Sequence, residues 1–146
     1  MISMEMEGKI WKAGKFWLIE VPALDAMTQG GTRKEALSMI EDLVFEMAQS
    51  YFKDDLEGNF AVTVIDYKKD IIGVIANDNK LLLALSLRRQ REKSGSTVRE
   101  VSERLGSKSP NAYAQYEKGK IGISLDKYEQ LLKAANPFEP RHLKLA

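Results

Sequence analysis

Residues 97–119, TVREVSERLGSKSPNAYAQYEKG, constrain the fold of this chain more than any other stretch. Thr97 and Glu100 have the spacing of a capping box, in which a hydroxyl and a carboxylate satisfy free amides at a helix start. Gly106 predicts the end of that helix, and the Ser-Pro pair at 109–110 predicts the start of another. The stretch ends on a second helix-stopping glycine. The pattern predicts two helices of about eight residues joined by a tight turn.

The second of these helices has an apolar and a polar side. We expect Ala112, Tyr113 and Tyr116 to lie on the apolar side and to pack into a core. The polar side and its flanks suit nucleic acid, because amides and hydroxyls read base edges and lysines reach phosphates. The candidate DNA-contacting residues are Lys108, Ser109, Asn111, Gln115, Lys118 and Lys120. A solvated polar surface without a ligand is the alternative.

The net charge of +1 hides an asymmetry between the two halves of the chain. Residues 1–80 hold 9 Lys/Arg and 14 Asp/Glu, a net charge of −5, whereas residues 81–146 hold 13 and 7, a net charge of +6. An acidic half followed by a basic half indicates two modules with different partners, and the basic half is the candidate for binding a polyanion. Uneven surface charge without functional meaning is the simpler reading.

The first half alternates between strand and helix patterns. We expect the order strand, strand, helix, strand, strand, at residues 5–13, 15–21, 32–51, 60–67 and 71–76. Residues 26–31, AMTQGG, are expected to form a loop, because paired glycines permit unusual backbone angles or close approach. The helix has one continuous apolar face, which must cover a sheet. The first half is therefore predicted to be an α+β domain with a mainly antiparallel sheet and one helix.

The second half is predicted to be an all-α domain of four helices. The polar segment 77–79 marks the boundary, so the predicted domains are 1–77 and 78–146. The first helix of the second domain, 81–93, is apolar at its start and basic at its end. The last helix, 124–135, is expected to turn four side chains inward, those of Leu125, Tyr128, Leu131 and Leu132.

No pattern in the chain is typical of catalysis. There is no cysteine, which excludes disulfides and thiolate sites and fits a cytoplasmic protein. The single histidine, His142, is expected to be solvated. No apolar run approaches the roughly 18 residues of a membrane span. We expect no metal, cofactor or catalytic residue; a metal-dependent hydrolase is the weaker alternative, with carboxylates drawn from Glu20, Asp25, Asp66 and Asp70.

The segments LRRQREKSGSTVREVSERLG and NAYAQYEKGK resemble the helix-turn-helix domain of lambda-repressor-like (Xre) regulators. That resemblance implies an ion pair between Arg91 and Glu117, and lysines beside the DNA backbone. Val98 and Pro110 depart from the family's pattern, at positions that usually contact a phosphate and a base. The base-contacting positions that the resemblance implies are Ser109, Asn111 and Gln115.

The segment FWLIEVPALDAMTQGGTRKEALSMIEDLV resembles the antitoxin HicB, through the strand, VPAL, TQG and T-x-x-EAL in this order. With the C-terminal segments, the likeness extends over residues 5–137. It implies a degraded RNase H-like domain that binds the small mRNA-cleaving toxin HicA, and a helix-turn-helix that binds the operator of its own operon. The alternative is a stand-alone repressor whose first domain senses a ligand or dimerises.

We expect a homodimer or a higher homo-oligomer. One helix-turn-helix of this size covers about one half-site, and specific repressors usually span two half-sites. The sheet edge and the apolar segment LLLALSL, residues 81–87, are both candidates for the contact between copies.

Overall fold

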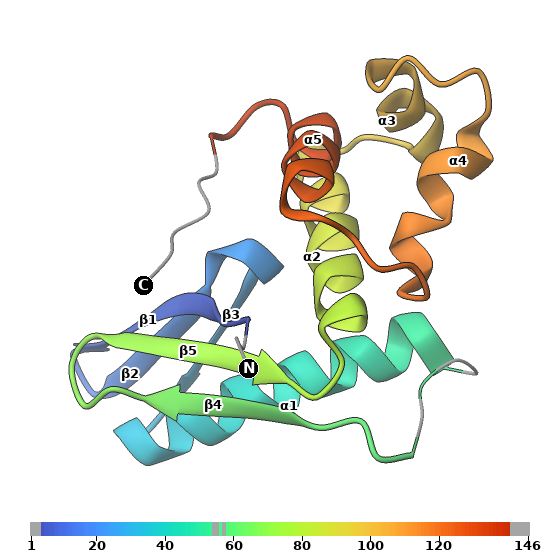
Figure 1. The fold of residues 1–146 in the computed structure, drawn as a ribbon. Helices are drawn as coiled ribbons and strands as arrows, with labels where there is room; N and C mark the ends of the chain where they lie inside the picture. Colours follow the sequence, from blue (N-terminus) through green and yellow to red (C-terminus); the bar gives the residue numbers. More distant parts are fainter. Residues whose placement is uncertain (1–3, 54–55, 57, 141–146) are drawn as a thin grey trace.

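A computed structural model of the chain describes residues 4–53, 56 and 58–140. An antiparallel sheet with one long helix is followed by a group of shorter helices (Figure 1). The first part contains β1 (Met6–Ala13), β2 (Phe16–Val21), the 3-10 turn η1 (Pro22–Leu24), β3 (Ala26–Gly30), α1 (Arg33–Phe52), β4 (Val62–Asp66) and β5 (Ile71–Ala76). The second part contains α2 (Asn79–Ser94), α3 (Val98–Arg104), α4 (Pro110–Ala114), the 3-10 turn η3 (Tyr116–Lys118) and α5 (Leu125–Ala135).

The five strands form one sheet in the order β3-β2-β1-β5-β4, and all neighbours are antiparallel. α1 lies against one face of this sheet and contacts β2, β3 and β4. Its apolar stripe, with Ile40 and Val44 fully buried, meets Ile19, Ile72 and Val74 of the strands. The predicted antiparallel sheet with one helix is confirmed.

The prediction of a loop at residues 26–31 is wrong, because residues 26–30 form the edge strand β3. β3 pairs with β2 along its whole length, from Trp17 opposite Gly30 to Val21 opposite Ala26. Backbone pairing therefore overrides the turn preference of the sequence. Gly30 is needed for a different reason, since a Cβ there would lie 2.5 Å from the backbone nitrogen of Ala36 at the start of α1.

α2 belongs to two hydrophobic cores. Leu81, Leu82 and Leu85 are buried with the sheet and α1, whereas Leu87 is buried with α3, α4 and α5. The predicted domain boundary after residue 77 therefore falls just before a helix whose first half completes the N-terminal core. The suggestion that residues 81–87 contact a second copy is wrong, because most of this segment is buried within the chain.

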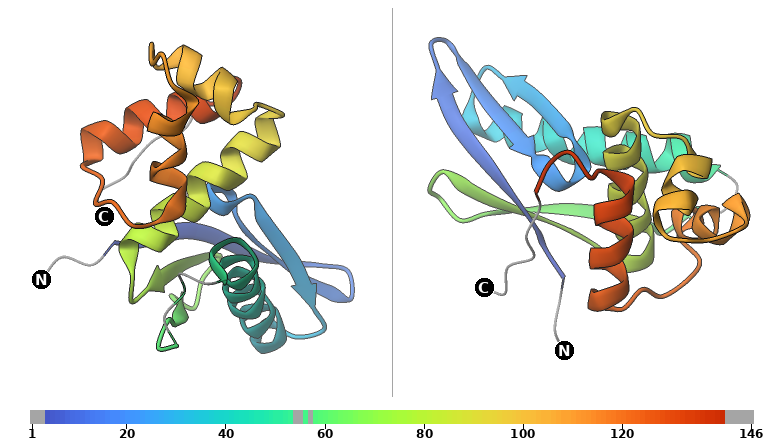
Figure 2. Two further views of the ribbon diagram at one scale, coloured as in Figure 1. Left: turned by 90° about the vertical axis from the view of Figure 1, so that its right-hand side faces the viewer. Right: turned by 90° about the horizontal axis from the view of Figure 1, so that it is seen from above.

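Polar side chains of α2 hold the segment that joins β2 to β3. The Gln90 amide donates to the carbonyl of Pro22 at 2.8 Å, and Ser86 donates to the carbonyl of Ala23 at 2.9 Å. Arg89 donates to the carbonyls of Leu24 and Asp25, at 3.0 and 2.6 Å. These bonds satisfy four consecutive carbonyls and join the sheet domain to α2. The ribbon views show α2 passing close to the sheet (Figure 1, Figure 2).

Asp66, a candidate carboxylate for hydrolysis, is part of a structural ion pair. Arg33 at the start of α1 donates to Asp66 at 2.7 Å and to the carbonyl of Lys69 at 2.5 Å. The backbone amide of Lys68 donates to the same carboxylate at 2.8 Å. The hydrogen bond from Arg33, followed by that from Lys68, lowers the pKa of Asp66 below its ordinary value of 3.8. The cluster fastens the β4–β5 turn to α1.

We predict that Asp66→Asn lowers the melting temperature by a few degrees at neutral pH, because Arg33 loses its charged partner. A carboxylate whose pKa is lowered by folding stabilises the folded state above its unfolded pKa, and that contribution disappears as pH falls through the folded value. The difference from wild type should therefore shrink as the pH falls below the ordinary pKa of 3.8. Thermal melts at several pH values measure this. The control Asp70→Asn alters a nearby turn carboxylate, and an equal effect from it would contradict the assignment.

Candidate nucleic-acid interface

The two helices expected within residues 97–119 are present as α3 and α4, at the end of the molecule remote from the β1–β2 hairpin (Figure 1). The capping box predicted at the start of α3 is confirmed. Thr97 accepts from the amide of Glu100 at 3.1 Å, and the Glu100 carboxylate accepts from the amide of Thr97 at 3.0 Å. The bond to the Thr97 amide lowers the pKa of Glu100. Gly106, with φ of 75°, follows the last turn of α3.

The second element is shorter than the single helix expected from the sequence. Ser109 caps α4 and Pro110 is its first residue, but the regular helix ends at Ala114. Gln115 leads into η3, which ends at Gly119 with φ of 74°. A Cβ at Gly119 would lie 2.5 Å from the side chain of Leu81, so this end of the element packs closely against the start of α2.

All six candidate DNA-contacting side chains are exposed, as a binding role requires. Asn111 and Gln115 lie one helical turn apart on α4 and at its end. The Ser109 hydroxyl accepts from the amide of Asn111 at 3.3 Å, which leaves its proton to donate to an acceptor. The exposed candidate side chains of this segment are Lys108, Ser109, Asn111, Gln115, Lys118 and Lys120.

Two expectations about the apolar sides are wrong. Ala112 is exposed, because it lies in the first turn of α4, although Tyr113 is 1% exposed and Tyr116 is partly buried as expected. Burial, followed by the charge of Glu117, raises the pKa of Tyr113. Leu125 is 65% exposed, since it is the first residue of α5 and precedes the turns that face the core.

Arg91 and Glu117, expected to pair, form two hydrogen bonds of 2.7 and 3.0 Å. Their side chains are only 15% and 9% exposed, so the pair is largely desolvated. Arg91 also donates to the carbonyl of Ser96 at 3.1 Å, and the bond to Glu117 raises its pKa. The pair joins the end of α2 to η3. It therefore helps to set the orientation of α4 and η3 relative to α2.

Two structural residues escaped the sequence reasoning. Gln90 is fully buried, and it accepts from the Asn136 amide at 3.0 Å besides donating to the sheet domain. Its position three residues after Leu87, on the apolar side of a helix, is a signal that could have identified it. Arg104 donates to Ser96 and to the carbonyl of Ala134, at 2.7 and 2.8 Å. No local sequence pattern predicts the hydrogen bond from Arg104 to Ala134, because the two residues lie thirty positions apart in the sequence.

Within residues 4–53, 56 and 58–140, no group of three or more His, Asp or Glu side chains is placed to hold a metal ion. No helix within the same ranges has the length and apolarity to cross a membrane. His142 lies outside the described residues.

Comparison with known families bears on the C-terminal helices. The family model described as Helix-turn-helix matches residues 87–139, which includes the second half of α2 and all of α3, α4, η3 and α5. The C-terminal part is a helix-turn-helix domain. This match supports a DNA-binding transcription regulator. No curated protein matches the chain.

Removing one partner of the Arg91–Glu117 pair should destabilise the helix-turn-helix domain. We predict that Arg91→Ala lowers the free energy of unfolding by about 3 kcal/mol, because it leaves a desolvated carboxylate unpaired. Chemical denaturation measures the change. The double variant Arg91→Met with Glu117→Met removes both charges and should recover most of the loss. An unchanged stability of Arg91→Ala would show that the pair has no structural role.

Gln115 is expected to read a base through its amide. We predict that Gln115→Ala weakens operator binding by about 1–3 kcal/mol and relaxes sequence preference. Fluorescence anisotropy with operator and random duplexes measures both effects. An equal loss on both duplexes would contradict base reading.

Lys118 is expected to contact a phosphate, so its variant should behave differently from that of Gln115. We predict that Lys118→Ala weakens binding to operator and random DNA by similar factors. The slope of log affinity against log salt should fall by about one. A loss confined to the operator would instead make Lys118 a base reader.

Proposed function

We propose that this chain is the antitoxin of a type II toxin–antitoxin system. Its helix-turn-helix domain binds the operator of its own operon. Its N-terminal domain, a degraded RNase H-like fold, binds and neutralises a HicA-like mRNA-cleaving toxin. The single observation that carries the DNA-binding step is the exposed polar element of α4 and η3 within the matched residues 87–139.

The assignment of the first domain rests on its resemblance to HicB and on its charge. A protein that cleaves mRNA must bind a polyanion, so its binding surface is basic. The N-terminal residues 1–80 carry a net charge of −5, which attracts such a surface. We assign the chain no catalysis of its own; Asp66, one of the four candidate carboxylates for a hydrolase, is paired with Arg33.

The proposed protein acts as a homodimer or higher homo-oligomer in the cytoplasm. One helix-turn-helix of this size covers about one half-site, so two copies are needed to span an operator with two half-sites. No cofactor or metal takes part in either binding step.

A stand-alone repressor with a ligand-sensing or dimerising first domain is the second candidate. The observation that favours it is the set of hydrogen bonds from α2 to the carbonyls of residues 22–25. Those bonds fasten the helix-turn-helix to the sheet domain, as a sensor domain would require.

Co-expression with any small basic open reading frame beside the gene tests the proposal, and absence of such a frame would favour the stand-alone repressor. We expect the two products to purify as one complex in which RNA cleavage by the partner is suppressed. The complex or the free chain should retard a duplex taken from the region upstream of the operon. Operator binding without any complex would favour the stand-alone repressor, and absence of both activities would reject both candidates.

A further inference from the structure

The sheet has a second face, opposite α1, whose side chains are set by strand register. Side chains of paired residues lie on the same face, and residues two apart along a strand share it. Ile10 and Ile19 pair on the buried face, so Trp11 and Leu18, which also pair, point the other way. The same register places Lys9 and Ile71 on this second face. We call this surface the open face; its members on the five strands include Glu7, Lys9, Trp11, Phe16, Leu18, Glu20, Met27, Gln29, Thr63, Ile65, Ile71 and Ile75.

The open face is more apolar than a solvated sheet face usually is. Antiparallel sheets with one covered face normally turn polar side chains to water on the other. Here Phe16, Met27 and Ile71 are 49%, 54% and 40% exposed. Four further apolar side chains are partly exposed and belong to neither hydrophobic core of the described residues: Trp11, Leu18, Ile65 and Ile75. Contiguous exposed apolar area of this kind is typical of interaction surfaces.

The charged groups on the open face are mainly acidic. Glu7 and Glu20 share it with Lys9. Glu5 adds a third carboxylate, because its side chain occupies the space beside Gly73 and accepts from the Tyr67 hydroxyl at 2.6 Å. Acidic groups among exposed apolar side chains complement a basic protein surface with apolar side chains.

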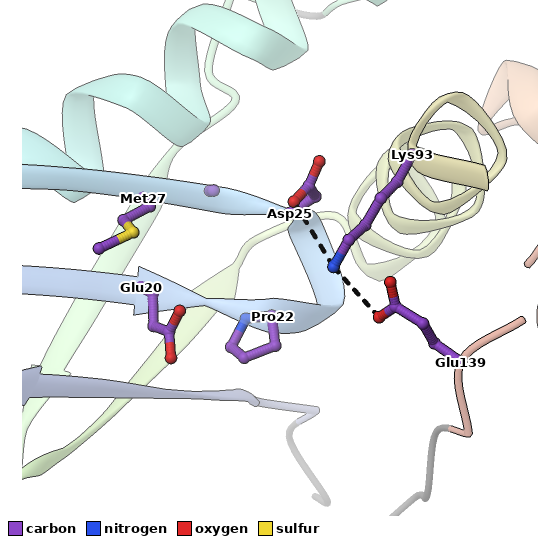
Figure 3. Close-up of a pocket in the computed structure, with 7 residues that line it drawn as sticks. Glu20, Pro22, Asp25, Met27, Lys93 and Glu139 are labelled. Carbon is purple, nitrogen blue, oxygen red and sulfur yellow. Dashed lines mark hydrogen bonds and ion pairs between the residues drawn. The ribbon is translucent and has the colours of Figure 1, made fainter. Parts of the chain in front are cut away.

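A hollow of about 320 Å³ adjoins the open face where the sheet meets α2 (Figure 3). Glu20 and Met27 line it from neighbouring strands, and Lys93 reaches into it from α2. Lys93 lies 3.9 Å from Asp25 and 3.1 Å from Glu139. Asp25 and Glu139 therefore flank the Lys93 ammonium, and Glu20 adds a third carboxylate to the lining, so the hollow suits a further cationic side chain.

We propose that the open face, with this hollow at its end, is the surface that binds the basic ribonuclease partner. This inference rests on the proposed function and adds the location of the partner. A second copy of the chain is a poorer occupant, because it would bring three carboxylates against three.

The test compares the same substitutions, methionine or glutamate to lysine, on the open face and on the outer side of α1. Met27→Lys and Glu20→Lys alter the open face. Their matched controls are Met39→Lys and Glu46→Lys, which alter exposed residues on the outer side of α1. Calorimetry with a catalytically inactive variant of the HicA-like toxin that co-purifies with the chain measures its affinity for each full-length chain. We expect the open-face variants to bind at least about tenfold more weakly, because each adds a positive charge facing a basic surface.

Both controls should keep wild-type affinity, and all four variants should keep wild-type operator binding, which shows that they are folded. Equal partner affinity for all four variants would overturn the location while leaving the proposed function intact. A wild-type chain that binds no partner would overturn the proposed function and this inference together. Loss of self-association in the open-face variants, with partner binding retained, would assign the face to a second copy and overturn the inference.

Discussion

The structure depends on one helix that completes two cores. The first half of α2 buries Leu82 and Leu85 with the sheet, and Leu87 begins the core of the helix-turn-helix domain. Polar side chains of α2, those of Ser86, Arg89 and Gln90, donate to the carbonyls of residues 22–25. These hydrogen bonds hold α2 in place against the sheet domain. A helix held in this way cannot turn within one core without losing packing or hydrogen bonds in the other.

The position of the DNA-reading element follows from α2. Arg91, near the end of that helix, holds Glu117 in η3, and Leu81 at its start packs against Gly119. η3 and the glycine that follows it are thus attached near both ends of α2. A five-residue helix and one 3-10 turn have little stability of their own, because helix nucleation is costly. The orientation of Gln115 and its neighbours is therefore set by tertiary contacts rather than by the local sequence.

The difference between local and tertiary determinants explains which features could be predicted from the sequence. Capping boxes, proline and glycine act over three or four residues, so Thr97, Ser109 and Gly119 could be assigned from the sequence and were found in those roles. β3 was missed because its pairing with β2 competes with a glycine-rich turn signal, and only the assembled sheet decides between them. Arg104 was missed for the same reason, since its acceptors are brought near by folding. The exposure of Ser109, Asn111, Gln115 and Lys118 followed from helical spacing, but the end of the regular helix before Gln115 did not.

The contacts of α2 also relate the two proposed binding surfaces, which are the open face and the DNA-reading element of α4 and η3. Glu20 and Met27 of the open face flank residues 22–25, and Gln90 and Arg89 of α2 hold that segment by its carbonyls. Lys93 of α2 also reaches into the adjoining hollow. A partner seated there would contact both residues 22–25 and α2, the helix that pairs with η3 through Arg91. Because α2 contributes to both hydrophobic cores, we expect partner binding to change operator affinity to the extent that the partner prefers one position of α2.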